Sequence, residues 1–227
     1  MEEMYDRTRI LAGDEGVERL KGASVLVMGT GGVGSYAAEA IGRAGVGRVT
    51  LMDGDSVQAS NLNRQLVALT STLGRNKAEV MAERIRDINP DAEVNAVPEF
   101  YKTGEEIDLT QFDWVIDAID DVDAKTELIR RATESGVNII SAMGAAGKFG
   151  TDFIVEDISK TQTCPLAKVM RKRLRAIGIE HLPVVYSKEK PVPRTGDLGT
   201  LSYVPGSMGL TLAGYVIRQI AGIGEGN

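Results

Sequence analysis

Three glycines form the pattern G-x-G-x-x-G at Gly29, Gly31 and Gly34, directly after an apolar run and before a helix-forming stretch. Glycines let the backbone approach a phosphate closely, and N–H groups at the start of a helix donate to phosphate oxygens. Asp53 ends the next apolar run, where a carboxylate accepts hydrogen bonds from ribose hydroxyls in such sites. The spacing predicts a nucleotide-binding site and leaves open which nucleotide is bound.

Two basic residues follow this pattern. Arg64 belongs to the stretch N-x-N-R-Q, which begins at Asn61, and Lys77 opens the next expected helix. Chemistry at a triphosphate needs cations along the phosphate chain, whereas a dinucleotide site for hydride transfer needs little beyond backbone dipoles at one pyrophosphate. A surface salt bridge is the simpler interpretation of Arg64 alone. Together with Lys77 and an acid at Asp120, it favours ATP chemistry.

Three aspartates, Asp117, Asp120 and Asp121, end an apolar run that we expect to form the strand beside the first one. A carboxylate beside a polyphosphate repels it unless a metal ion intervenes, so magnesium is the natural partner. We expect Asp120 to be the magnesium ligand. The alternative role for an aspartate here is to cap the following helix, and Asp121 is the better candidate for that cap.

These residues depend on the elements that position them. Apolar runs predict strands at residues 24–28, 48–52, 94–97, 114–119 and 138–141, and helices are expected from the glycine pattern to residue 44, from about 75 to 88, and up to 135. Such an alternation predicts a parallel sheet with right-handed crossovers. The expected fold class is therefore α/β, with a Rossmann-like doubly wound, mostly parallel sheet.

The second half of the chain is less regular. We expect short strands near 153–155, 184–186 and 201–204, antiparallel ones among them, a basic helix over 166–176 and a packed amphipathic helix over 208–223. No linker is long enough to separate an independent domain. We therefore expect one domain over residues 1–227, in which 1–147 form the nucleotide-binding core and 148–227 form an irregular C-terminal extension.

The composition excludes several kinds of site. The chain of 227 residues has one cysteine, Cys164, and one histidine, His181, so neither an internal disulfide nor a cysteine-rich or two-histidine zinc site is possible. Ser-His-Asp and Cys-His catalysis would both depend on His181. No apolar run reaches the length of a membrane span, and the N-terminus lacks the order of a secretory signal, so we expect a cytoplasmic protein without membrane contact.

The charge is unevenly distributed. The chain carries a formal charge of −6, but the stretch from Lys160 to Arg194 holds nine basic and two acidic residues, so its net charge of +7 leaves −13 for the rest. The expected basic helix carries Lys168, Arg171, Lys172, Arg173 and Arg175, and Lys188, Lys190 and Arg194 follow in a loop. A compact basic patch on an acidic protein is the expected footprint of an RNA that docks in one place, and a solvated helix face is the alternative.

Five motifs follow one another between Arg7 and about Gly147: G-x-G-G-V-G-S, D-x-D, N-x-N-R-Q, G-x-x-K and D-A-I-D-D. In this order and spacing they resemble the ubiquitin-activating-enzyme-like (ThiF/MoeB/HesA) adenylyltransferases. The resemblance implies binding of ATP and Mg²⁺ and activation of a carboxylate as an acyl adenylate. It also implies a homodimer in which an N-terminal arginine reaches the partner's ATP. We assign this role to Arg7, with Arg9 as the alternative.

The resemblance carries specific residues with it. It assigns nucleotide binding to Gly29, Gly31, Gly32, Gly34, Asp53, Asp55, Asn61, Arg64 and Lys77. It assigns catalysis to Arg7, Arg64, Lys77 and Asp120, with Asp120 also the metal ligand. The C-terminal extension is then expected to bind the substrate and to contribute to the dimer.

The second half distinguishes branches of this superfamily. Activators of sulfur carriers typically have two C-x-x-C zinc pairs and a catalytic cysteine, which a chain with only Cys164 does not provide. The stretches TQTCPLAKVMRKRLRAIGI, VVYSKEKP and LGTLSYVPGSMGLTLA resemble instead the tRNA threonylcarbamoyladenosine dehydratases. That branch implies tRNA as partner, adenylation of the threonyl carboxylate, ring closure by an atom of the substrate, and release of pyrophosphate and AMP. Cys164 is then expected to be a buried or loop thiol.

Two other functions stay open from the sequence. An adenylyltransferase for the C-terminus of a ubiquitin-like sulfur carrier protein would need a groove for an extended tail and a transfer cysteine. An NAD-dependent oxidoreductase is the more remote alternative, and it would bind NAD without ATP turnover. A monovalent cation near the loops, and a partner system of a cysteine desulfurase and its sulfur acceptor, also stay open.

Overall fold

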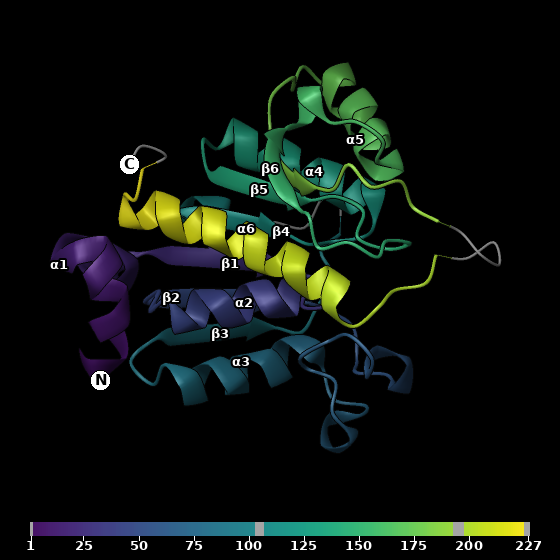
Figure 1. The fold of residues 1–227 in the computed structure, drawn as a ribbon. Coiled ribbons are helices and arrows are strands. Elements are labelled where there is room, and N and C mark those ends of the chain that lie inside the picture. The colour runs from purple at the N-terminus through teal and green to yellow at the C-terminus, as the bar shows by residue number, and fades with distance from the viewer. Residues whose placement is uncertain (1, 103–106, 193–197, 225–227) are drawn as a thin grey trace.

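A seven-stranded sheet forms the centre of the structure (Figure 1). The computed structural model describes residues 2–102, 107–192 and 198–224. The strands are β1 (Ser24–Met28), β2 (Arg48–Met52), β3 (Glu93–Val97), β4 (Trp114–Asp117), β5 (Asn138–Ala142), β6 (Ile154–Asp157) and β7 (Pro183–Tyr186). Their order is β3-β2-β1-β4-β5-β7-β6, parallel throughout except for the antiparallel pair β6 and β7. The expected α/β class, with antiparallel strands in the second half, is confirmed.

The middle of the sheet is set by β1, whose five residues are all buried. A strand that is covered on both faces is mostly apolar, which explains the run from Val25 to Met28, whereas the buried Ser24 donates a hydrogen bond to Asp113. Met28 lies in register with Met52 of β2 and with Asp117 of β4. Because the three strands are parallel, their carboxyl ends meet at one edge of the sheet. The segments that carry the predicted site residues are therefore brought together.

Six α-helices lie around the sheet in the part of the chain that the structure describes: α1 (Asp6–Gly22), α2 (Gly34–Arg43), α3 (Lys77–Ile88), α4 (Val122–Glu134), α5 (Pro165–Ala176) and α6 (Tyr203–Ala221). Short 3-10 helices occur at Glu2–Tyr5, Ala59–Asn61, Thr70–Thr72, Leu109–Gln111 and Ile158–Lys160. Helices α2, α3 and α6 cover one face and α4 and α5 the other, whereas α1 packs beside the end of α6 (Figure 1).

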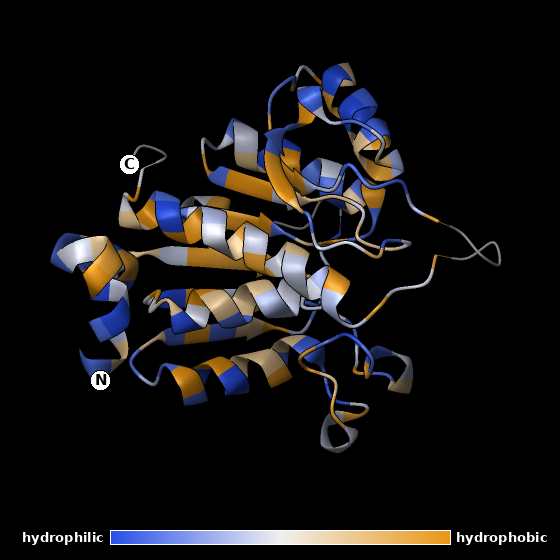
Figure 2. Cartoon of the chain, in the orientation of Figure 1, coloured by the Kyte–Doolittle hydropathy of each residue, from blue (hydrophilic) through white to orange (hydrophobic). Residues whose placement is uncertain are grey.

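Two hydrophobic cores lie on the two faces of the sheet. Val25 and Val27 of β1 pack into the core shared with α2, α3 and α6. Leu26 and Met28 point the other way, into the core shared with α4 and α5. This alternation follows from the two-residue period of a strand. Figure 2 shows the result as hydrophobic strands between helices of mixed character.

The strand expected at 201–204 is wrong. These residues lead into α6, which begins at Tyr203, and Val204 is fully buried in the core against α2. Pro205 lies in the first turn, where its missing N–H has no intrahelical partner to lose. Aromatic and β-branched residues favoured a strand, but burial of one helical face decides the conformation here. The expected strand at 114–119 is also shorter, because it ends at Asp117.

The N-terminal helix α1 was not among the elements predicted from the sequence. Gly13, with a φ of +69°, interrupts it and separates two helical parts. Ile10 and Leu11 are exposed before this kink, whereas Val17 and Leu20 are buried after it. The two parts therefore share no continuous apolar stripe, and the helical period is hidden in the sequence.

The C-terminal helix α6 confirms the packed helix expected over 208–223. It lies along α2, and glycines at the crossing allow the two backbones to approach closely. Within residues 2–102, 107–192 and 198–224, none of the helices combines the length and the apolar character needed to cross a membrane.

We expect Gly209→Ala to destabilise the fold. A Cβ at this position would lie 2.2 Å from the carbonyl oxygen of Val33, and a backbone atom cannot move aside cheaply. Overpacking of this kind costs about 1–3 kcal/mol. Gly214→Ala is the matched control, because a Cβ there meets nothing within 4 Å and should stabilise the helix by about 0.5–1 kcal/mol. Urea unfolding measures both, and equal unfolding free energies would contradict the close packing of α6 on α2.

Candidate active site

The carboxyl ends of the strands open into a cavity of about 900 Å³. This is the edge of the sheet on the right of Figure 1, where α2 and α6 begin. The wall includes the glycine-rich turn, the segments after β2, β3, β4 and β5, and the start of α5. Ligands bind at this position in open α/β sheets.

The glycine-rich turn joins β1 to α2. Gly29 has a φ of +88°, which a residue with a side chain rarely adopts. Gly34 opens α2 so close to the turn that a Cβ would lie 1.8 Å from the oxygen of Gly29. Gly31 and Gly32 line the cavity. The structure therefore confirms the strand–turn–helix context of the motif and places its backbone against the cavity.

Asp53 supports this turn from the end of β2. Its Oδ2 accepts hydrogen bonds from the backbone N–H of Thr30 at 2.7 Å and from the hydroxyl of Thr30 at 3.0 Å. Its Oδ1 accepts from the N–H of Asp55 at 2.9 Å. Asp53 also lines the cavity, so the predicted ribose contact stays open to it. The additional role in holding the turn was missed, because the sequence gives no sign that Thr30 faces Asp53.

Lys77 lies in the cavity wall at the start of α3. Its side chain is only 7% exposed, and Nζ lies 2.7 Å from Oδ2 of Asp55. The preceding Asn76 fixes the start of the helix, because its side chain accepts from the N–H of Glu79 and donates to the carbonyl oxygen of Asp53. The ammonium group is therefore held in place by both its partner and its helix.

Arg64 also lines the cavity, next to Gly32. Its Nη1 donates to the carbonyl oxygen of Ser60 at 3.0 Å and to Oδ1 of Asn63 at 2.8 Å. Asn61 does not line the cavity. Its Oδ1 accepts from the N–H of Gln58, and its carbonyl oxygen accepts from the N–H of Arg64. Asn61 thus builds the turn that presents Arg64, and a direct contact with the nucleotide stays a prediction.

The three aspartates at the end of β4 and directly after it have three different roles. Asp117 is fully buried and pairs with Lys125 of α4. Asp121 accepts from the N–H of Ala124 at 2.7 Å and caps α4, as predicted. Asp120 is exposed at the cavity and has no hydrogen bond or ion pair with any residue that the structure describes.

Magnesium fits a single carboxylate at this point. Among the described residues, no group of three or more histidine, cysteine, aspartate or glutamate side chains is arranged to hold a metal ion. Mg²⁺ is usually bound by one or two carboxylates together with phosphate oxygens and waters, and not by a cage of protein ligands. Asp120, with an unpaired carboxylate beside the phosphate turn, matches this kind of site.

The sequence did not predict that two further residues, Lys148 and Cys164, would line the cavity. Lys148, in the segment after β5, is 4% exposed and its Nζ donates to the carbonyl oxygen of Glu189. Burial lowers the pKa of its ammonium group. Cys164 is 3% exposed, occupies the N-cap position of α5 and lines the same cavity. The buried thiol agrees with the expectation for Cys164, but no sequence motif marks Lys148.

The N-terminal arginines do not line the cavity. Helix α1 lies beside the other end of the strands (Figure 1). Arg9 forms ion pairs with Glu2, Asp6 and Asp14. Arg7 is exposed and has no partner among the residues described. Of the two arginines, Arg7 is therefore the one available for a contact outside its own chain.

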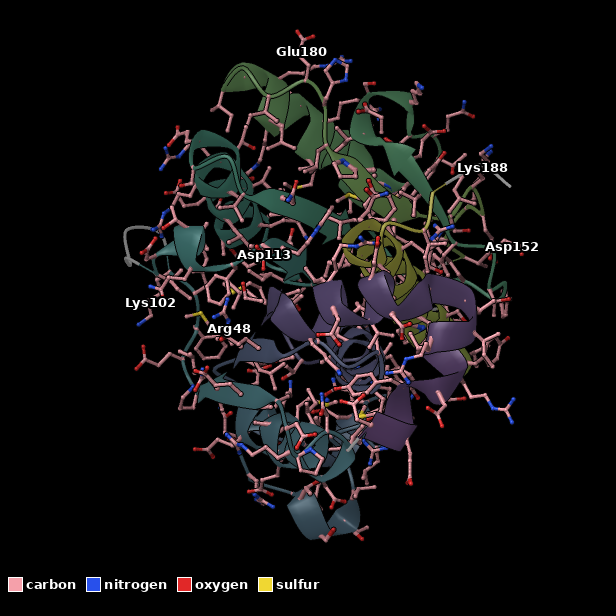
Figure 3. All side chains as sticks on the ribbon, turned by 90° about the vertical axis from the view of Figure 1, so that its left-hand side faces the viewer. Arg48, Lys102, Asp113, Asp152, Glu180 and Lys188 are labelled. Atoms are coloured by element: carbon pink, nitrogen blue, oxygen red, sulfur yellow. The ribbon has the colours of Figure 1, made fainter. Side chains whose placement is uncertain are left out.

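The basic residues of α5 divide into two groups. Arg171 donates to the carbonyl oxygens of Ile158 and Thr161, and Arg173 pairs with Asp123, so both are used within the chain. Three others, Lys168, Lys172 and Arg175, are exposed and have no partner in the described part of the chain. Lys188 and Lys190 are exposed as well, and Lys188 lies at the edge of the molecule in Figure 3. Arg194 lies outside the described residues.

Comparisons with known proteins agree with this geometry. The sequence pattern of the ThiF family matches residues 5–227. The tRNA threonylcarbamoyladenosine dehydratase of Bacillus subtilis is 40% identical over 238 aligned residues, which cover 95% of this chain and 94% of that protein. A solved structure of the Escherichia coli dehydratase TcdA in complex with ATP superposes with a TM-score of 0.90, at 34% identity, over 98% of this chain and 95% of that one. The sulfur carrier protein adenylyltransferase of Thermus thermophilus is 28% identical over 97% of this chain and 58% of its own length.

Gly31→Ala and Gly34→Ala should separate nucleotide binding from folding. A Cβ at position 31 has room, with its nearest neighbour 3.7 Å away, but it would project where phosphates must approach the backbone. We expect normal thermal unfolding and affinity for ATP at least about tenfold lower, a loss of about 1.4 kcal/mol, by calorimetry. Gly34→Ala should instead destabilise the fold by about 3 kcal/mol. Unchanged ATP affinity of the Gly31 variant would contradict the role of this turn.

Proposed function

We propose, from the premise that this chain belongs to the ThiF family, that it is an ATP-dependent tRNA threonylcarbamoyladenosine dehydratase. The observation that carries the proposal is the 40% identity to such an enzyme over nearly the whole of both chains, cavity included. The cavity supplies what an adenylation needs: a phosphate turn, two cations and an unpaired carboxylate. Activation of a sulfur carrier protein is the second candidate, because the sulfur carrier protein adenylyltransferase of Thermus thermophilus is a more distant relative and is much longer than this chain.

ATP is the nucleotide that this arrangement favours. The turn at Gly29–Gly34 would receive the phosphates on its backbone, and Asp53 would lie near the ribose. Arg64 and Lys77 would balance the charge of the phosphate chain. Asp55 and Asn61 would contribute indirectly. Asp55 forms an ion pair with Lys77, and Asn61 builds the turn that carries Arg64.

Mg²⁺ would be held by Asp120 together with phosphate oxygens. When bound, the ion neutralises charge that develops on the leaving pyrophosphate. A monovalent cation and a cysteine desulfurase with its sulfur acceptor remain predictions from the sequence.

The reaction would proceed in two steps. A carboxylate oxygen of the threonyl group attacks the α-phosphorus of ATP, the bond to the β-phosphate oxygen breaks, and pyrophosphate leaves. An atom of the substrate's own carbamoyl group then attacks the activated acyl carbon, loses its proton, and AMP leaves with the former carboxylate oxygen. The substrate loses one water in total. Because the attack is intramolecular, it is entropically favoured and needs no nucleophile from the protein.

This reaction needs neither a cysteine nor a histidine as a nucleophile or base from the protein. Cys164 is buried as a helix cap, and His181 is exposed beside Asp157, with Nδ1 3.2 Å from Oδ2. Neither residue is needed when the substrate supplies the nucleophile. The roles of Arg64, Lys77 and Asp120 are then to position the phosphates and to stabilise the charge that develops on them.

We further propose that the protein acts in the cytoplasm as a homodimer in which Arg7 reaches the partner's ATP. Residues 1–147 would bind ATP, and 148–227 would bind the substrate and contribute to the dimer. Support for Arg7 comes from its exposure and lack of a partner in the described chain, in contrast to Arg9 with its three acidic neighbours.

The exposed side chains of α5 would contact the phosphates of tRNA. Lys168, Lys172 and Arg175 are the candidates that carry uncommitted charge. Arg171 and Arg173, which the sequence also suggested, would contribute only if they left their partners in the chain.

Mass spectrometry tests the activity directly. Incubation with ATP, Mg²⁺ and tRNA that carries threonylcarbamoyladenosine should remove one water from the modified nucleoside and form AMP and pyrophosphate. We expect Arg64→Ala and Lys77→Met each to slow the reaction by about 10²- to 10³-fold, because each removes charge stabilisation at the phosphates. Arg43→Ala, on the exposed end of α2, is the matched control and should be unaffected. Unchanged turnover of the first two variants would refute their role, and adenylation that requires a carrier protein in place of tRNA would favour the alternative.

The salt dependence of tRNA binding tests the basic face. Each phosphate contact contributes about 0.7 to 0.9 to the slope of log affinity against log salt concentration. The combined substitution of Lys168, Lys172 and Arg175 by Gln should therefore lower the slope by about 2. Arg48→Gln is the control, because Arg48 opens β2 at the end of the sheet opposite the cavity (Figure 3). An unchanged slope in the triple variant would place the tRNA elsewhere.

A further inference from the structure

The strand order divides the cavity wall into three parts. The segments after β2 and β3 contribute Asp53 and residues 99–102. The segments after β1 and β4 contribute the glycine turn and Asp120. The remaining side consists of the segment after β5, the start of α5 and four residues before and at the start of α6, and it holds Lys148 and Cys164; the four residues are Pro191, Leu198, Thr200 and Pro205. If the nucleotide is bound by the first two parts, the third part is left for the acceptor.

Arg64 and Lys77, the two cations expected to bind the nucleotide phosphates, do not belong to this third part of the wall. Arg64 and Lys77 both follow β2 in the chain, and β2 lies on the opposite side of β1 from β4 and β5. A triphosphate that is bound by these two cations would leave the third part of the wall free for the acceptor group. The third side is therefore the place for the acceptor group.

Lys148 is the charged group of this side. Its ammonium is buried, yet its side chain lines the cavity. One of its three N–H groups is used by the carbonyl oxygen of Glu189. The carboxylate of Glu189 accepts instead from the N–H groups of Phe149 and Gly150, both at 2.9 Å. No carboxylate in the described chain forms an ion pair with Lys148, although Glu189 and Cys164 lie near enough to interact with its charge.

The neighbouring wall is suited to one small anion. Met143, Gly144 and Leu166 give it an apolar surface. The first turn of α5 adds a partial positive charge, and its cap residue Cys164 makes no side-chain hydrogen bond to that turn. A buried ammonium group in apolar surroundings favours a small ligand that carries one negative charge and forms hydrogen bonds with it.

We propose that Lys148 binds the carboxylate of the acceptor substrate before adenylation. This inference rests on the proposed function, in which that carboxylate is the threonyl group of the modified nucleoside in tRNA. A cation at this position offsets the repulsion between the incoming carboxylate and the phosphates of ATP. It also explains why a lysine is buried in this wall, where its charge otherwise has no ion-pair partner in the described chain.

The test compares two tRNAs that differ only in the carboxylate-bearing group. Affinities are measured without ATP for tRNA with threonylcarbamoyladenosine and for the same tRNA with unmodified adenosine. Wild type should bind the modified tRNA about 10- to 100-fold more tightly, as expected for hydrogen bonds to a charged group. Lys148→Met and Lys148→Gln should bring this ratio close to one, and Lys148→Arg should retain part of it. Lys160→Met, at an exposed position, should leave the ratio unchanged.

The outcomes separate this inference from the proposed function. If wild type removes water from the nucleoside but both neutral variants, folded by thermal unfolding, keep the full ratio, the inference is overturned and the function stands. If wild type neither dehydrates the nucleoside nor distinguishes the two tRNAs, the proposed function fails and the inference falls with it. If Lys148→Met fails to fold, the ratio of affinities for modified and unmodified tRNA is compared between Lys148→Gln and Lys148→Arg. Equal ratios in these two variants overturn the inference, and a ratio that is lost only in Lys148→Gln supports it.

Discussion

The site depends on one fully buried ion pair. Nζ of Lys125 lies 2.7 Å from Oδ2 of Asp117, and neither side chain is exposed. Removing two charges from water costs several kcal/mol per ion, which only good geometry and further hydrogen bonds offset. Here Ser141 donates to Asp117 at 2.6 Å and accepts from Lys125 at 3.1 Å, and the N–H of Ile119 donates to the other carboxylate oxygen at 3.1 Å. The network joins β4, α4 and β5, so it fixes both the loop that carries Asp120 and the strand that leads to the segment of Lys148.

The sequence predicts the parallel part of the sheet well for a physical reason. Strands that are covered on both faces, such as β1, consist mostly of apolar residues, and the turns after them carry glycine or aspartate. Elements that depend on their neighbours are predicted poorly. Val204 and Pro205 begin a helix because α2 covers them, and α1 has no continuous apolar stripe because Gly13 interrupts it. Local patterns do not contain this information.

The site shows the same division. Gly31, Lys77 and Asp120 were predicted because motifs with fixed spacing place Gly31 and Asp120 after adjacent strands and Lys77 at the start of a helix, and all three line the cavity. Lys148 and Cys164 line the same cavity but were not predicted to do so. They meet only because the chain crosses from β5 through β6 to α5 and returns, a path that no local spacing reveals. The sequence likewise gave five basic residues on α5 equal weight, although Arg171 and Arg173 are already held by other residues of the chain.

Three cations of the cavity, Lys77, Arg64 and Lys148, share one property that bears on catalysis. Lys77 is held by Asp55, Arg64 by Ser60 and Asn63, and Lys148 by the carbonyl oxygen of Glu189. Each therefore occupies its position in the structure without a ligand, and little reorganisation is required when charge develops on a bound phosphate. The unpaired carboxylate of Asp120 is the exception, and a carboxylate facing phosphates is unfavourable until a metal ion joins them. The fixed cations and the unpaired carboxylate of Asp120 thus favour a nucleotide that arrives with its metal ion, and they disfavour one that carries only a single pyrophosphate.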